Sequence, residues 1–312
     1  MNLFVFGLGY SALHFARRYR DRFGMIAGTA TSAEKAAALR AEGIEAFVFD
    51  GEAADPRIAD ALAEADALLV SIPPDAGGDP VLRHFGEAAV AVHRLAWIGY
   101  LSTVGVYGDH AGGWIDEDTP ARPADGRSRQ RLEAETAWLA LGARSGKAVH
   151  VFRLAGIYGP GRNALSQLAA GTARRIAKAG QVFNRIHVDD IAAVLAASMA
   201  RPSPGAVYNL ADDEPAPPQE VVAHAARLAG VAPPPEVPFA EARLSPMAAS
   251  FWGECKRVSN RRLKDELGVA LAYPSYREGL AALQAAGEGP PAGKGPPAGE
   301  GPPAGEPRGQ AA

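Results

Sequence analysis

The sequence has very little cysteine, no excess of charge of either sign and no long apolar run. Cys255 is the only cysteine, so we expect neither an internal disulfide nor a thiolate metal cluster. The chain has 32 lysines plus arginines against 35 acidic residues, and a formal charge of −3 gives no field that would attract nucleic acid or a membrane surface. No stretch approaches the roughly 20 apolar residues of a membrane span. We therefore expect a cytoplasmic protein without nucleic-acid or membrane partners.

Short apolar runs alternate with longer helical patterns over the first half of the chain. "NLFVFG" precedes the helical pattern "ALHFARRYRDRF", and further helices are expected near residues 79–93 and 127–144. This alternation indicates repeated βαβ units and an α/β fold with a doubly wound parallel sheet. We predict a core over residues 1–160. Residues 161–286 would supply the remaining sheet elements and a small C-terminal lobe that closes over the carboxyl ends of the strands.

The end of the chain differs in composition from the rest. Residues 287–312 read "GEGPPAGKGPPAGEGPPAGEPRGQAA", an imperfect proline- and glycine-rich repeat without large apolar side chains. Such a segment buries too little surface to offset its ordering entropy, and we expect a disordered tail. Its glycines do not recur regularly enough for a collagen helix. A proline-rich partner motif is the alternative to a solvated linker.

The loop "GLGYSA" has the pattern of a dinucleotide-binding turn. It places Gly7, Gly9 and Ala12 in a G-x-G-x-x-A frame directly between an apolar run and a helical pattern. The first glycine permits a tight turn, the second lets the backbone approach a pyrophosphate, and the alanine keeps helix and strand close. The N–H groups of Tyr10 and Ser11 open the helix and would face the anion. We expect a Rossmann-type core, with an empty glycine turn as the alternative.

The residues after the second expected strand bear on which dinucleotide is bound. NAD sites usually place an acid there to hold the ribose 2′-hydroxyl. This chain has "GTATSAEK", in which Thr31, Ser32 and Lys35 could accept a 2′-phosphate, so NADP is favoured over NAD. The same residues could simply cap the following helix. Asp50, at the end of "FVFD", would meet the adenine edge or cap a turn.

After the fourth expected strand, "SIPPDAGGDP" would run beneath the cofactor. Ser71, Ile72 and Pro73 are expected to contact its nicotinamide half through backbone atoms. The alternative is that this segment is an ordinary proline-containing loop.

Four further motifs follow the glycine loop in order, and together they are specific: "YLSTVGVYGD", "FRLAGIYGPG", "IHVDDIA" and "VYNLADDEP". With them the chain resembles the extended short-chain dehydrogenase/reductases, the NAD-dependent epimerase/dehydratase family, over residues 2–285. The resemblance implies that Thr103, with Ser102 beside it, hydrogen-bonds the oxygen of the substrate that reacts.

The resemblance fails at the family's Y-x-x-x-K-x-x-x-E motif, which here reads Arg127, Arg131 and Glu135. In the family the tyrosine exchanges the proton, and the lysine holds the nicotinamide ribose. Arg131 can replace the lysine as a cation and donor, although its fork geometry differs. Arg127 cannot replace the tyrosine, because a guanidinium titrates far above neutral pH. The chain therefore resembles an atypical subgroup of the family that lacks the active-site tyrosine.

No other residue is an obvious substitute for the missing tyrosine. His110 follows the expected strand that ends at Thr103 and is a weak candidate for the replacement acid; a loop histidine without a role is the favoured alternative. Tyr107 and Tyr158 are expected to pack. The arginines at 127, 129, 131, 153 and 162 would suit an anionic substrate, such as a phosphorylated or nucleotide-linked sugar.

Two functions remain open. The first is an NAD(P)-dependent oxidoreductase or epimerase/dehydratase-like enzyme acting on a small anionic or sugar-type substrate, and we favour it. The second is a non-catalytic NAD(P)-binding sensor, which the missing tyrosine suggests. A homodimer through the helices near 79–93 and 127–144 is also possible, although both could pack only against the sheet.

Overall fold

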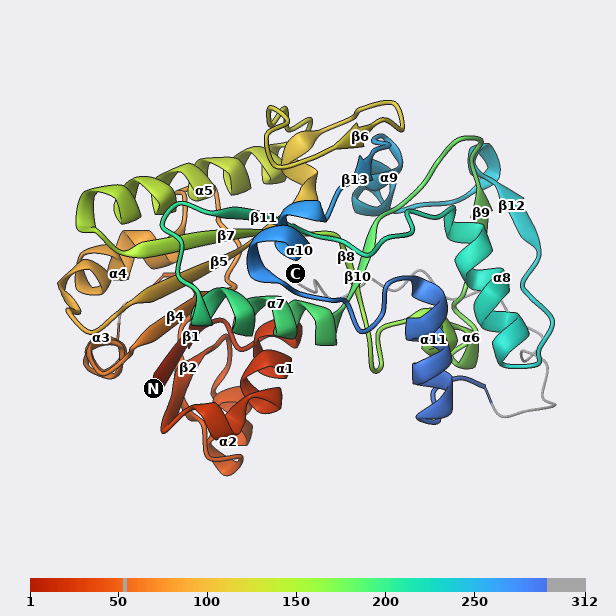
Figure 1. The fold of residues 1–312 in the computed structure, drawn as a ribbon. Coiled ribbons are helices and arrows are strands. Elements are labelled where there is room, and N and C mark those ends of the chain that lie inside the picture. The colour runs from red at the N-terminus through yellow and green to blue at the C-terminus, as the bar shows by residue number, and fades with distance from the viewer. Residues whose placement is uncertain (53–54, 291–312) are drawn as a thin grey trace.

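The computed structural model describes residues 1–52 and 55–290, and a seven-stranded parallel sheet forms its centre (Figure 1). The strand order is β3-β2-β1-β4-β5-β7-β11, and every neighbouring pair is parallel. The strands are β1 Asn2–Phe6, β2 Met25–Ala30, β3 Glu45–Val48, β4 Ala67–Val70, β5 Trp97–Thr103, β7 Ala148–Leu154 and β11 Val207–Leu210. The order reverses next to β1, where open α/β sheets bind ligands at the carboxyl ends of their strands.

Helices cover both faces of the sheet, because side chains along each strand point alternately to opposite sides. Leu3 and Val5 belong to the core under the first group of helices, whereas Phe4 and Phe6 belong to the core under the second. The first group is α1 Tyr10–Arg18, α2 Ala33–Ala41, α7 Val188–Ala200 and α10 Arg261–Leu267. The second is α3 Pro56–Ala63, α4 Pro80–Ala91 and α5 Gly126–Ser145. This arrangement confirms the predicted doubly wound α/β fold.

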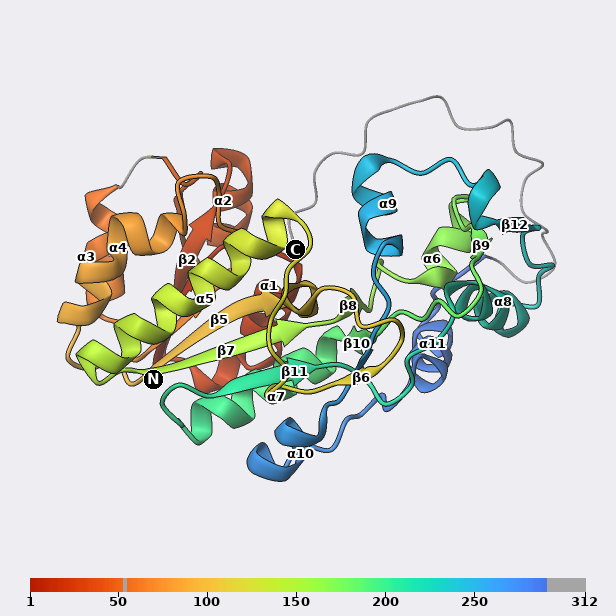
Figure 2. The same ribbon diagram turned by 90° about the horizontal axis from the view of Figure 1, so that it is seen from above.

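A smaller lobe lies beyond the carboxyl ends of the strands, on the opposite side from α3 and α4 in Figure 2. It has its own apolar core, to which α6, α8 and α11 contribute. Three two-stranded parallel sheets complete the structure, β10-β8, β12-β9 and β13-β6. The elements are β6 Trp114–Ile115, β8 Gly156–Tyr158, α6 Ala164–Ala169, β9 Arg175–Ala177, β10 Arg185–His187, α8 Pro218–Leu228, β12 Glu236–Pro238, α9 Pro246–Trp252, β13 Arg257–Val258 and α11 Tyr276–Ala285, with 3₁₀ turns η1 Arg20–Arg22, η2 Val104–Tyr107 and η3 Phe239–Glu241.

The end of the chain differs in part from the expected tail. Residues 291–312, most of that prediction, lie outside the described residues. Residues 287–290 are described, and the carboxylate of Glu288 accepts hydrogen bonds from the Gly161 backbone N–H at 2.7 Å and from Asn163 Nδ2 at 3.0 Å. The packed part of the chain therefore continues past residue 287, because backbone and amide donors hold a carboxylate without any apolar burial.

No helix in the described ranges is both long enough and apolar enough to cross a membrane. Residues 161–286 supply α7, β11 and α10 around the main sheet as well as most of the lobe.

Candidate functional site

The glycine loop connects β1 to α1 with the geometry that an anion-binding turn requires. Gly7 adopts φ +87°, which favours glycine, and a methyl group there would lie 2.9 Å from Ile72 Cγ1. Its N–H donates to Thr29 Oγ1 at 2.9 Å, and the N–H of Leu8 donates to the Thr29 carbonyl at 2.8 Å. Strand β2 therefore fixes the loop from below. The sequence had not identified Thr29, a buried polar residue inside an apolar strand, as part of this turn.

The N-terminus of α1 is open. Its N-cap is Gly9, which offers no side-chain hydrogen bond, and no acidic residue occupies the first turn. A methyl group on Gly9 would approach only the Gly7 carbonyl, at 3.9 Å, so there is room above the loop. Unpaired N–H groups and the helix dipole favour an anion at this place. The backbone N–H groups of Tyr10 and Ser11 lie at this open end, and Ala12 is buried.

The residues expected at the adenosine end are exposed and partly engaged. Ser32 caps α2 by accepting the Lys35 N–H at 3.2 Å, as its alternative interpretation anticipated. Thr31 and the Lys35 side chain are exposed. Asp50 accepts the Glu52 N–H at 3.0 Å and so stabilises its own turn. Of the four residues expected at the adenosine end, Lys35 is the one with a positive charge. The Ser32 hydroxyl is already engaged as the cap of α2.

The segment Ser71–Pro73 follows β4 beside the glycine loop, as expected. The N–H of Ser71 donates to the Phe6 carbonyl at 2.9 Å, which extends the β1–β4 ladder by one residue. The contact between Gly7 and Ile72 brings the two loops together at the carboxyl edge.

Arg131 connects the loop after β4 to strand β5. Its guanidinium is buried, and Nη1 donates to the Leu101 carbonyl at 2.9 Å, the Tyr100 hydroxyl at 3.2 Å and the Ile72 carbonyl at 3.5 Å. These contacts use one nitrogen of the fork. Nε and Nη2 have no hydrogen-bond partner within residues 1–52 and 55–290 and can serve a ligand.

Thr103 ends β5 at the same edge, and its Oγ1 accepts the N–H of Gly105 at 3.1 Å. A methyl group on Gly105 would lie 3.4 Å from this oxygen and 3.0 Å from Ser128 Oγ. Ser128 is buried, and its hydroxyl donates to Asp125, the N-cap of α5, at 3.2 Å. Two hydroxyls therefore flank one turn. Sequence reasoning missed Ser128, whose only signal is its place on the same helical face as Arg131.

Ser102 points to the other side of the strand. Its hydroxyl donates to Glu135, which forms a buried ion pair with Arg153. The Arg153 guanidinium also lies over the ring of Tyr107, 4.8 Å from its centroid. The third position of the altered motif thus belongs to a buried polar network. The predicted role of Ser102 toward a substrate stays a prediction, since its hydroxyl is engaged here.

The Arg127 side chain points away from the core. Its side chain is exposed, and Nη2 donates to Ser250 Oγ in α9 at 3.1 Å. The guanidinium carbon lies 5.9 Å from the centroid of the Phe251 ring. The residue at the family's tyrosine position therefore reaches from α5 across to the lobe.

The nearby phenols and imidazole are all engaged. Tyr107 is buried and donates to Asn209 Oδ1 at 2.8 Å, and burial raises its pKa. Burial also raises the pKa of Tyr100 and Tyr158 far above the ordinary value. The ring of His110 contacts the Tyr107 carbonyl at 3.2 Å. The three phenols are therefore buried, and none of them is a free substitute for the tyrosine that the motif lacks at position 127.

The lobe touches the glycine loop through Tyr10. Its hydroxyl donates to the Pro160 carbonyl at 3.0 Å, and Arg162 lies over its ring at 5.6 Å. Burial raises the pKa of this phenol to about 12, although the positive charge of Arg162 opposes the rise. The contact couples the expected phosphate turn to the loop after β8.

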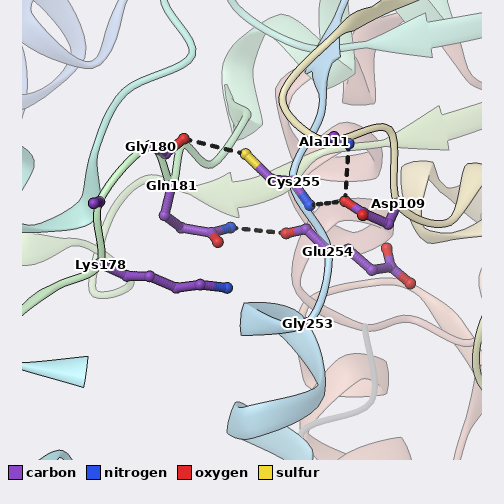
Figure 3. Close-up of a pocket in the computed structure, with 9 residues that line it drawn as sticks. Asp109, Ala111, Lys178, Gly180, Gln181, Gly253, Glu254 and Cys255 are labelled. Atoms are coloured by element: carbon purple, nitrogen blue, oxygen red, sulfur yellow. Dashed lines mark hydrogen bonds between the residues drawn. The ribbon is translucent and has the colours of Figure 1, made fainter. Parts of the chain in front are cut away.

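A cavity of about 250 Å³ lies between the loop after η2 and the lobe, as Figure 3 shows. Cys255 Sγ donates to the Gly180 carbonyl at 3.4 Å, and the Cys255 N–H donates to Asp109 at 2.7 Å. The lining residues are Asp109, Ala111, Lys178, Ala179, Gly180, Gln181, Gly253, Glu254 and Cys255. The glycine loop does not line it, and it could not be predicted from the sequence because its wall comes from three distant segments.

Comparison with known proteins agrees with this geometry. The model of the NAD dependent epimerase/dehydratase family matches residues 88–211. "Protein YeeZ" of Escherichia coli K12 is 30% identical over 281 residues, which cover 86% of this chain and 95% of that protein. A "3-diazoavenalumate denitrifying reductase" of Streptomyces is 30% identical over 181 residues, covering 54% of this chain and 55% of that one.

A solved structure from Silicibacter pomeroyi, described as a functionally unknown conserved protein, is 51% identical. It covers 92% of this chain and 99% of its own, with a TM-score of 0.83. Together with the full-length relationship to the Escherichia coli protein, these matches show that the chain belongs to the NAD-dependent epimerase/dehydratase family.

Proposed function

We propose that the protein is an NAD(P)-dependent oxidoreductase that transfers a hydride to or from a small anionic or sugar-type substrate. The observation that carries the proposal is the open N-terminus of α1 at the same sheet edge as Thr103 and Arg131. A nicotinamide group bound there would supply or accept the hydride. The name of the Streptomyces relative, a reductase, supports the same class of chemistry.

Each residue of the edge has a part in this proposal. The turn at Gly7 and Gly9 holds the pyrophosphate through backbone N–H groups, and Arg131 directs its free Nε and Nη2 at the cofactor ribose. Thr103 donates a hydrogen bond to the reacting oxygen of the substrate, and Ser128 lies within reach of the same turn. Both hydroxyls would stabilise charge that develops on that oxygen.

The preference for NADP over NAD depends on one positively charged side chain, that of Lys35. The preference for NADP relied on two hydroxyls and a lysine, but the hydroxyl of Ser32 is used as a helix cap. Among the residues expected at the adenosine end, Lys35 is the one that offers positive charge for a 2′-phosphate, and the family description names NAD. Nicotinamide dinucleotide binding is therefore the proposal, and either form fits the edge.

A non-catalytic sensor is the second candidate. It is favoured by Arg127, which occupies the place of the proton donor yet contacts the lobe. In this case the cofactor would bind and fix α9 without any reaction.

Calorimetric titration with NADP, NADPH, NAD and NADH tests the proposal first. Binding of one pair to the wild type and its loss in Gly9→Ala would support a dinucleotide site. No binding of any of the four would remove both candidates. If binding holds, turnover that falls in Thr103→Ala favours the enzyme, whereas binding without turnover by any acceptor favours the sensor.

A homodimer through α4 and α5 stays a proposal. Both helices keep partly buried apolar residues beside the core, among them Leu82, Val90 and Leu139. Light scattering coupled to size exclusion at micromolar concentration tests it, and a monomer would count against it.

A further inference from the structure

Arg127 lies between the lobe and the carboxyl edge of the sheet, where Thr103 ends β5. It precedes Ser128, whose hydroxyl borders the Thr103 turn, and its side chain ends at Ser250 in α9. Within the described residues no carboxylate lies in salt-bridge range of its guanidinium. The hydroxyl of Ser250 already donates to the Met247 carbonyl at 2.8 Å, so it is a neutral acceptor for Arg127. An anion would form a stronger, charge-assisted hydrogen bond at the same place.

Helix α9 presents an apolar face next to this cation. Met247 and Phe251 are four residues apart, on one side of the helix, and are 55% and 61% exposed. The two side chains together give α9 an exposed apolar face. The Phe251 ring lies beside the Arg127 guanidinium. Cation and apolar surface thus meet at one point.

The buried Trp252 at the end of α9 anchors the helix to the lobe. Trp252 is buried, stacks on Phe239 at 5.1 Å and meets Phe183 edge-on at 5.2 Å. Lys178 donates to the Trp252 carbonyl. Met247 and Phe251 are therefore not needed to hold α9 in place, and their exposure leaves them free to contact a ligand.

We propose that Arg127, Phe251 and Met247 form the substrate anchor, and that the substrate is an aromatic carboxylate. The inference rests on the proposed function, because it requires Thr103 and Ser128 to contact the reacting group of the substrate. The guanidinium binds the carboxylate, the phenyl ring and the thioether cover the aromatic body, and the reacting group points down toward Thr103.

A hydroxyl-rich sugar fits this anchor poorly. A hexose needs several hydrogen-bond donors and acceptors around its ring, and its desolvation is costly where it finds none. The exposed face of α9 offers a phenyl ring and a thioether instead. An aromatic acid matches both components, since its ring packs on Phe251 and its charge complements Arg127.

Ligand-observed NMR titration tests the anchor without requiring turnover. The probes are 2-naphthoate, its neutral analogue 2-naphthamide, and glucose 6-phosphate, each with and without saturating NADH. The proteins are wild type, Arg127→Gln, Phe251→Ala and the matched control Arg144→Gln, which removes an exposed arginine in the last turn of α5. Thermal melting and NADH affinity establish that each variant is folded.

The expected result is that 2-naphthoate binds the wild type and that Arg127→Gln weakens it about tenfold to a hundredfold, the effect of losing one charged hydrogen bond. Phe251→Ala weakens it as well, Arg144→Gln leaves it unchanged, and the other two probes bind at least about tenfold more weakly.

Three results would overturn the anchor: no binding of 2-naphthoate, equal effects of Arg127→Gln and Arg144→Gln, or glucose 6-phosphate binding as well as 2-naphthoate. Failure of the proposed function looks different, because NADH would not bind. In that case 2-naphthoate binding that depends on Arg127 would still support the anchor as a site.

Discussion

The carboxylate of Glu135 and the guanidinium of Arg153 form a buried ion pair, with Oε2 and Nη2 2.7 Å apart. The Glu135 side chain is 1% exposed and that of Arg153 is 9% exposed, and together they connect α5 to β7. The hydroxyl of Ser102 satisfies the other carboxylate oxygen. Two charges buried in this way must stabilise each other, because water does not solvate either of them.

Glu135→Ala is expected to lower the free energy of unfolding by about 3–5 kcal/mol, since it leaves the Arg153 charge buried without a partner. Urea denaturation measures the change. Arg144→Ala provides the control, because its pair with Glu87 is exposed and should contribute at most about 1 kcal/mol. Equal effects of the two substitutions would show that burial of the Glu135 pair carries no special cost.

The two glycines of the phosphate turn should respond differently to alanine. Gly7→Ala introduces a methyl group 2.9 Å from Ile72 Cγ1 at a positive φ, so it should lower the melting temperature as well as dinucleotide affinity. Gly9→Ala has room for its methyl group in the protein and should leave the melting temperature nearly unchanged. It should still reduce dinucleotide affinity at least about tenfold, since the methyl group occupies the space of the ligand. Unchanged affinity in Gly9→Ala would place the pyrophosphate elsewhere.

Stability should fall in mild acid because of His150. Its Nε2 accepts the Ser203 N–H at 2.9 Å and its Nδ1 lies 2.8 Å from Ser198 Oγ, so the ring must be neutral. Burial lowers its pKa from 6.5 to about 4. The unfolded chain therefore binds the proton more readily, and the stabilisation present above pH 6.5 is lost as the pH falls toward 4, by up to about 3 kcal/mol. Urea unfolding at pH 7.5 and 5 should show a smaller difference in His150→Gln than in the wild type; an equal difference would contradict the assignment.

Asp212 should act in the opposite direction. Burial raises its pKa to about 8 against the opposing charge of Arg185, and Oδ2 has no hydrogen-bond partner among the described residues. The folded protein then holds the proton more tightly than the unfolded chain, so the free energy of unfolding falls as the pH rises from about 4 to about 8. Asp212→Asn removes this loss. Relative to wild type, the variant should gain at least about 1 kcal/mol between pH 5 and pH 8.5 in urea unfolding, and no gain would mean that Asp212 is ionised in the fold.

The main architecture could be predicted from the sequence because it depends on local patterns. The fully apolar runs of a parallel sheet and the glycine turn at Gly7 are encoded within a few residues each, and the structure has them where they were expected. The limits of α5 differ by one residue at each end from the expected 127–144. Helix caps such as Asp125 set those limits, and the caps were not used in the expectation.

The surroundings of the site could not be predicted in the same way. The contact of Arg127 with Ser250 joins residues 123 positions apart, and no local pattern encodes such a pairing. Ser128 became informative only when the helix phase was known, since Arg127 and Arg129 on either side of it are exposed. The use of the Ser32 hydroxyl as a cap likewise depends on where α2 begins.

The row of buried polar residues along α5 also sets the position of this helix on the sheet. Arg131 and Glu135 bond to two different strands, through the Leu101 carbonyl of β5 and the Arg153 guanidinium of β7, whereas Ser128 bonds to Asp125, the N-cap of the same helix. Translation of α5 by one turn would break the bonds of Arg131 and Glu135 together. The two strands therefore fix the register of α5, and with it the place from which Arg127 leaves the helix.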